Sequence, residues 1–106
     1  MNPARILCLD DDATSIMMLV TALEKLPYQV YLAQNGTVAM HMTLNHTPSL
    51  LLIDLGLPDI NGFELIQSFQ AFKETKDIPF VIVSSDKSDE AKAQGLVLGA
   101  KAYLEK

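Results

Sequence analysis

Short apolar runs alternate with amphipathic stretches along the chain, and this alternation restricts the fold more than any other feature. The apolar runs lie at residues 5–9, 28–33, 50–53, 80–83 and 102–104. The amphipathic stretches lie between them, at about 14–26, 36–46, 61–73 and 87–98. Strands that alternate with helices favour βαβ units and a parallel sheet with right-handed crossovers. Because 106 residues suit one domain, the pattern predicts a single doubly wound α/β sheet.

The strand-like runs differ in composition, which predicts their places in the sheet. The runs at 6–9, 50–53 and 80–83 are continuously apolar, as strands covered on both faces should be. The runs at 28–33 and 102–106 mix polar and apolar residues, which suits the two edges. In an open sheet of this kind the ligand site lies at the carboxyl ends of the strands.

Composition excludes several classes of protein. A net charge of −5 argues against a general surface for nucleic acids or anionic membranes. The single cysteine, Cys8, allows neither a disulfide framework nor a cysteine-rich zinc site within one chain. The N-terminus does not resemble a signal peptide, and no apolar stretch approaches the roughly 18 residues that a membrane helix needs. The sequence therefore predicts a cytoplasmic domain that contacts neither nucleic acid nor membrane.

Charged and polar side chains follow four of the five predicted strands. They are Asp10 and Asp11 after the first strand, Asp54 after the third, Ser84 and Ser85 after the fourth, and Lys106 after the fifth. The carboxyl ends of parallel strands meet at one edge of a sheet. We therefore expect three carboxylates, two hydroxyls and one ammonium to converge on one crevice.

Three clustered carboxylates repel one another unless a cation offsets their charge. Mg²⁺ suits such a cluster, because it is bound by carboxylate, carbonyl, water and phosphate oxygens. The cation and Lys106 could neutralise phosphoryl charge while one carboxylate attacks a phosphate donor. Carboxylates are established nucleophiles that form aspartyl phosphates. The pattern thus predicts a Mg²⁺-dependent site for phosphoryl chemistry.

Taken singly, each of these residues has a plainer interpretation. Asp12 with Thr14 is typical of a helix start, and Asp54 alone is also typical of a turn. A lone Ser84 would be a hydrogen-bonded strand-end hydroxyl, and a lone Lys106 would be solvated. Only their placement on one edge favours a joint function.

The chain resembles the receiver domain of two-component response regulators over nearly its whole length. The matching segments are ILCLDDD, AQNGTVAM, LLIDLGLPDINGFEL, IPFVIVSS and GAKAYLEK. The third of these resembles the family's phosphoacceptor Asp, with a Pro four residues later and a Gly eight residues later. The resemblance implies a flavodoxin-like receiver fold over residues 1–106, with five parallel strands in the order 2-1-3-4-5.

The resemblance also implies the roles of the acidic cluster. Asp54 would accept the phosphoryl group. Asp10, Asp11 and Asp54 would hold Mg²⁺, and the backbone carbonyl of Gly56 would be a further ligand. These assignments make Mg²⁺ the expected cofactor.

Three further residues match the family's activation machinery. The hydroxyl of Ser84 would donate to a phosphoryl oxygen, and Lys106 would pair with another as a point charge. Tyr103 stands at the family's switch aromatic, whose ring turns inward when Ser84 moves toward the phosphoryl group. Phosphorylation would act through its different interactions with the two states.

The implied function is a signalling switch that catalyses only its own phosphorylation and dephosphorylation. A sensor histidine kinase or a histidine phosphotransfer protein would supply the phosphoryl group. The fourth helix and fifth strand would carry the output to a protein or domain outside this chain.

The family continues beyond the position of Lys106 with a Pro and a fifth helix. We expect this fold to end at its fifth strand, with the fifth helix absent and apolar surface on strands such as 50–53 partly exposed. A truncated sequence, a natural fragment or a helix supplied by another chain would each account for this. The last alternative predicts an oligomer formed through the uncovered face.

Two other functions remain open at this point. The segment LDDDAT also fits hhhDxDxT, the first motif of haloacid dehalogenase-type phosphatases, with Asp10 as nucleophile and Asp12 as acid/base. That match is short, and it leaves the segment around Asp54 unexplained. The other alternative is a receiver-like scaffold that binds a partner without phosphorylation.

Overall fold

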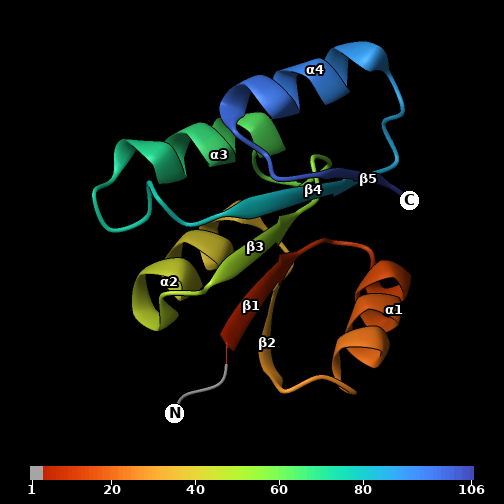
Figure 1. Cartoon of the computed structure of the whole chain (residues 1–106), viewed down its shortest axis with the longest axis vertical. Helices are drawn as coiled ribbons and strands as arrows, with labels where there is room; N and C mark the ends of the chain where they lie inside the picture. Colours follow the sequence, from red (N-terminus) through yellow and green to blue (C-terminus); the bar gives the residue numbers. More distant parts are fainter. Residues whose placement is uncertain (1–3) are drawn as a thin grey trace.

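The computed structural model describes residues 4–106, and its elements follow the predicted alternation (Figure 1). The strands are β1 (Ala4–Leu9), β2 (Tyr28–Ala33), β3 (Leu50–Ile53), β4 (Phe80–Ser84) and β5 (Tyr103–Glu105). The helices are α1 (Ala13–Leu23), α2 (Gly36–His46), α3 (Gly62–Ala71) and α4 (Asp89–Leu98). The predicted ranges 28–33, 36–46 and 50–53 agree with β2, α2 and β3 residue for residue.

All strand pairs are parallel, and the order across the sheet is β2-β1-β3-β4-β5. The predicted doubly wound, flavodoxin-like order is thus confirmed, with β2 and β5 at the edges. Helix α1 lies on one face of the sheet, and α2, α3 and α4 lie on the other (Figure 1). Right-handed crossovers require this division, because β1 to β2 is a step in the opposite direction to every later step.

The two faces of the sheet are not equally covered. Leu51 and Ile53 of β3 are buried in the core cluster beside α2, α3 and α4. The alternate residues Leu50 and Leu52 point to the α1 face and are only half-buried. The prediction of strands covered on both faces is therefore confirmed for residues 6–9, which are all buried, and wrong for 50–53 and 80–83, where alternate residues are only half-buried. The expectation that residues 50–53 are partly exposed is confirmed.

Helix α1 begins where the sequence predicts and ends three residues earlier. The Asp12 side chain accepts from the backbone N–H of Thr14 at 3.0 Å, which confirms its predicted place at the helix start. The helix ends at Leu23, and Leu26 lies in the following turn. Pro27 disfavours the helical conformation of the residue before it. Among residues 4–106, no helix is long and apolar enough to cross a membrane.

Candidate functional site

The backbone of the site residues extends the hydrogen-bonded ladder one residue past the strands. The N–H of Asp10 donates to the last carbonyl of β2 at 3.0 Å, and that of Asp54 to the last carbonyl of β1 at 2.9 Å. The N–H of Lys106 donates to the last carbonyl of β4 at 2.9 Å. The sheet therefore sets the direction in which these three side chains leave the backbone.

The three predicted acids form one cluster. A carboxylate oxygen from each of Asp10, Asp11 and Asp54 lies within 4.8 Å of the others. Asp10 and Asp54 are buried, whereas Asp11 is exposed. One oxygen of Asp10 accepts from the backbone N–H of Asp12 at 2.9 Å, and one of Asp54 from that of Gly56 at 3.2 Å. Oriented carboxylate oxygens at this spacing fit a hard divalent cation such as Mg²⁺.

Lys106 reaches both buried acids. Its Nζ lies 2.8 Å from Oδ2 of Asp10 and 3.0 Å from Oδ2 of Asp54. Partial burial works against the charged form, but the hydrogen bonds to the two carboxylates outweigh it, so the pKa of Lys106 is raised. A charged ammonium between two buried carboxylates offsets the cost of removing them from water.

Ser84 and Tyr103 are joined through one residue. The buried Oγ of Ser84 accepts from the backbone N–H of Asp86 at 3.1 Å. The hydroxyl of the half-buried Tyr103 donates to the backbone carbonyl of Asp86 as well. The peptide groups of Asp86 therefore connect the predicted hydroxyl with the predicted switch aromatic, a link that sequence reasoning did not identify.

A hollow of about 450 Å³ lies over the acid cluster. Its lining includes Asp11, Asp54, Gly56, Ser84 and Lys106. These five predicted site residues thus face a common space that a phosphoryl group can enter, whereas Asp10 and Tyr103 do not line it.

The second acid of the phosphatase motif is engaged elsewhere. Besides the Thr14 N–H, Asp12 accepts the hydroxyl of Ser15 at 3.1 Å. The Thr14 hydrogen bond, with that of Ser15, lowers the pKa of the Asp12 carboxyl. A carboxylate held ionised at a helix start is poorly suited to act as a general acid.

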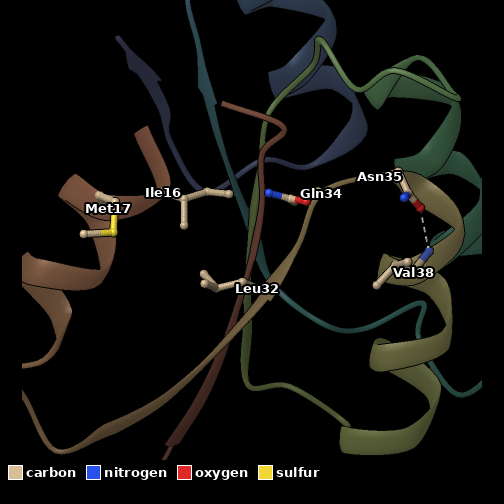
Figure 2. A pocket seen from close by; sticks show the side chains of 6 residues that line it. All are labelled: Ile16, Met17, Leu32, Gln34, Asn35 and Val38. Carbon is tan, nitrogen blue, oxygen red and sulfur yellow. Dashed lines mark hydrogen bonds between the residues drawn. The ribbon is translucent and has the colours of Figure 1, made fainter. Parts of the chain in front are cut away.

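A second hollow, of about 400 Å³, lies between α1, β2 and α2 (Figure 2). It is lined by Ile16, Met17, Leu32, Gln34, Asn35 and Val38. The Asn35 side chain accepts from the Val38 N–H at 2.9 Å and so caps α2 (dashed line in Figure 2). None of the predicted site residues lines this hollow.

Asp59 makes long-range contacts that the sequence did not predict. It is an exposed aspartate after Pro58, a pattern typical of turns. Its carboxylate accepts from two backbone N–H groups of α2, which lie 23 and 22 residues away along the chain. No local sequence pattern signals a contact at that separation.

Comparison with known proteins gives a consistent result. The family model "Response regulator receiver domain" matches residues 6–106. The chain is 35% identical to the protein PilH of Pseudomonas aeruginosa over 103 residues, which cover 97% of this chain and 85% of PilH. It is 34% identical to the phosphate regulon regulator PhoB of the same organism, covering 95% of this chain and 44% of PhoB. The chemotaxis protein CheY4 of Vibrio cholerae has a similar structure, with a TM-score of 0.89 and 25% identity; the match covers 98% of this chain and 87% of CheY4.

Proposed function

Because the chain belongs to the response regulator receiver domain family, we propose that it is a phosphoacceptor switch with Asp54 as the acceptor. The supporting observation is the position of Asp54, buried at the end of a central strand and bonded to Lys106 at 3.0 Å. The proposal treats residues 1–106 as one receiver domain. It also assigns the chain no activity beyond its own phosphorylation and dephosphorylation.

The donor set supports Mg²⁺ held by Asp10, Asp11, Asp54 and the backbone carbonyl of Gly56. When bound, the cation would neutralise negative charge on the phosphoryl oxygens. A carboxylate oxygen of Asp54 forms the new bond to phosphorus, and the bond to the donor's leaving group breaks with its electron pair. Lys106 then pairs with a phosphoryl oxygen. Hydrolysis later returns the Asp54 carboxylate and inorganic phosphate.

The shared contacts of Asp86 support a route from the site to the switch. When the hydroxyl of Ser84 turns to a phosphoryl oxygen, the Asp86 N–H loses the acceptor that it has in this structure. The same residue anchors the Tyr103 hydroxyl through its carbonyl. Movement of the Asp86 backbone therefore releases Tyr103 and changes the surface of α4 and β5.

Family membership also supports the proposed partners. A sensor histidine kinase or a histidine phosphotransfer protein in the cytoplasm supplies the phosphoryl group, and a separate protein or domain receives the output. The half-buried Leu50 and Leu52 on the α1 face support self-association through that face. A monomer mass by light scattering at high concentration would contradict the self-association.

Intact-mass measurement after incubation with acetyl phosphate and Mg²⁺ tests the acceptor. We expect one phosphoryl adduct on the wild type, none without Mg²⁺ and none on Asp54→Asn. Asp10→Asn should also lose it, because it removes a proposed ligand. Asp77→Asn, which removes an exposed carboxylate in the turn after α3, is the control and should keep the adduct.

The alternatives give different results in the same experiment. An adduct that survives Asp54→Asn and disappears in Asp10→Asn would move the nucleophile to Asp10 and favour a phosphatase. A folded wild type that forms no adduct would favour the scaffold.

A further inference from the structure

The segment between Asp54 and α3 forms a closed loop, residues 55–61. At its base, the N–H of Gly62 donates to the carbonyl of Leu55 at 3.1 Å. Leu55 and Leu57 are buried in the core cluster, and Gly56 lies between them and is exposed. The leucines on either side of Gly56 are thus anchored, and the Gly56 N–H donates to Oδ1 of Asp54 at 3.2 Å. The exposed part of the loop that follows Leu57 has no such anchor in the core.

Asp59, at the tip of the loop, holds the first turn of α2. Its Oδ1 accepts from the N–H of Gly36 at 2.7 Å, and its Oδ2 from the N–H and the hydroxyl of Thr37 at 3.0 and 3.1 Å. Among the described residues, Asp59 makes all the hydrogen bonds that join residues 55–61 to a helix or strand not adjoining them. The loop tip is therefore tied to α2 through this one side chain.

The geometry and charge of this contact favour a strong interaction. Helix N-termini leave backbone N–H groups without partners and carry partial positive charge. The hydrogen bond from the Gly36 N–H, with those from the N–H and hydroxyl of Thr37, lowers the pKa of the Asp59 carboxyl. Asp59 is therefore ionised at neutral pH. The chain packs closely here, since a Cβ added to Gly36 would lie 2.3 Å from Cγ2 of Ile60.

We propose that Asp59 is a positioning residue for the metal site: by tying the loop tip to α2, it holds the Gly56 backbone in place beside Asp54. This inference rests on the proposed function, in which the Gly56 carbonyl is a metal ligand. Asp59 itself touches none of the acids in the cluster. Removing the Asp59 side chain leaves every proposed metal ligand present but loosens the Gly56 carbonyl, which is the ligand that belongs to the loop.

Asn35 provides a matched control at the same end of the same helix. It caps α2 by accepting from the Val38 N–H, as Asp59 does from Gly36 and Thr37. Asn35 precedes α2 directly, so Asn35→Ala weakens the helix start without releasing the loop. A purely stabilising role of Asp59 predicts the same metal affinity in both variants, whereas a positioning role predicts different affinities.

The experiment measures Mg²⁺ affinity by calorimetric titration of the folded, unphosphorylated wild type, Asp59→Ala, Asp59→Asn and Asn35→Ala. Removing residues that orient metal ligands typically costs about 10- to 100-fold in affinity. Asp59 acts through a backbone loop, so we expect a loss on the order of three- to tenfold for Asp59→Ala. Asp59→Asn keeps one acceptor oxygen, so its Mg²⁺ affinity should lie between those of the wild type and Asp59→Ala. Asn35→Ala should remain within about twofold of the wild type, because the two sites do not share a partner.

Amide hydrogen exchange supplies a second readout that does not depend on metal. In the metal-free protein, the Gly36 and Thr37 amides should exchange faster in Asp59→Ala than in the wild type. Equal exchange rates would mean that the contact is not formed in solution and would overturn the inference.

The two proposals fail in different ways. If the wild type and Asp59→Ala bind Mg²⁺ with equal affinity, the positioning role is overturned and the proposed function is left intact. Equal weakening in Asn35→Ala would also overturn it, because helix stability alone would then explain the effect. A folded wild type that binds no divalent cation would overturn both.

Discussion

The ammonium of Lys106 lies 2.8 Å from a carboxylate oxygen of Asp10, although β3 and β4 separate the strands that carry them. The contact crosses the carboxyl edge of the sheet and joins its second and fifth strands in spatial order. A further 3.0 Å contact to Asp54 makes the ammonium a bridge between the two buried acids. The ammonium that we propose to pair with a phosphoryl oxygen is thus already engaged with two acids in this structure.

Lys106→Gln should therefore destabilise the metal-free protein by about 1–3 kcal/mol, since it leaves two buried carboxylates without their cation. Mg²⁺ should stabilise this variant more than the wild type, because the metal then supplies the positive charge that the lysine no longer does. Chemical denaturation with and without Mg²⁺ measures both effects. Lys101→Gln, at an exposed lysine, is the control. Equal free energies of unfolding for the wild type and Lys106→Gln would contradict the bridge.

The same bridge has a defined pH dependence. The pKa of Lys106 is raised above its ordinary value of 10.5. A group whose pKa is raised by folding stabilises the protein at pH values below its ordinary pKa. This contribution is lost as the pH rises through the folded-state pKa. The difference in unfolding free energy between the wild type and Lys106→Gln should stay constant from pH 7 to 9 and shrink above about pH 10.5. A difference that already shrinks near neutral pH would contradict this assignment.

Cys8 should make the protein less stable at alkaline pH. Burial, and secondarily the charge of Asp10, raise the pKa of its thiol from 9.0 to about 11. The thiol of the unfolded chain therefore ionises at lower pH, and stability is lost between pH 9 and 11. The difference between these two pKa values corresponds to a loss of at most about 2–3 kcal/mol in the free energy of unfolding. Denaturation of the wild type and Cys8→Ala across this range isolates the effect, and parallel stability curves would refute it.

Gly62→Ala should destabilise the loop that follows Asp54. An added Cβ would lie 2.6 Å from Cα of Leu55 and 3.0 Å from the carbonyl oxygen of Asp54. Both are backbone atoms, so the loop must move, at a cost of about 1–3 kcal/mol. The matched Gly56→Ala would meet only an oxygen of Asp54 at 3.9 Å and should change stability by less than about 0.5 kcal/mol. Similar unfolding free energies for the two variants would show that the loop yields easily.

Thr75 should contribute more to stability than the equally buried Thr43. The Thr75 hydroxyl donates to the carbonyl of Phe69 and secures the turn after α3. The Thr43 hydroxyl donates at 2.7 Å to the Ala39 carbonyl, which also has its regular helical partner. Thr75→Val should cost about 1–2 kcal/mol, and Thr43→Val less. Thermal unfolding of both variants tests the order, and a reversed order would refute this account.

Much of the fold could be predicted because its signals are local. The four-residue run 50–53 coincides with β3, and β2 and α2 also occupy their predicted residues. The sequence predicts too long a helix α1, because the apolar spacing continues to Leu26 while Pro27 stops the helix. The continuous apolar run identified Leu50 and Leu52 as strand residues. It did not reveal that the α1 face covers them only in part.

The candidate site could be predicted as far as strand ends determine it. Asp10, Asp54 and Lys106 each follow a strand directly, so the parallel sheet brings them together. The contacts of Asp59 with α2 could not be predicted, since they depend on how the loop after Asp54 folds toward the start of that helix. The link through Asp86 joins backbone groups, which every residue has, and sequence carries no signal for it.

The placement of β5 has a consequence for how the protein responds to heat. The two buried acids follow interior strands, whereas Lys106 follows a three-residue strand at the rim with a neighbour on one side only. Short edge strands fray at lower free-energy cost than the centre of a sheet. On warming, the ammonium should leave the acids while the core is still folded. The proposed phosphoacceptor site would then lose its ammonium before the core unfolds, and the edge strand would set the highest temperature at which the site is intact.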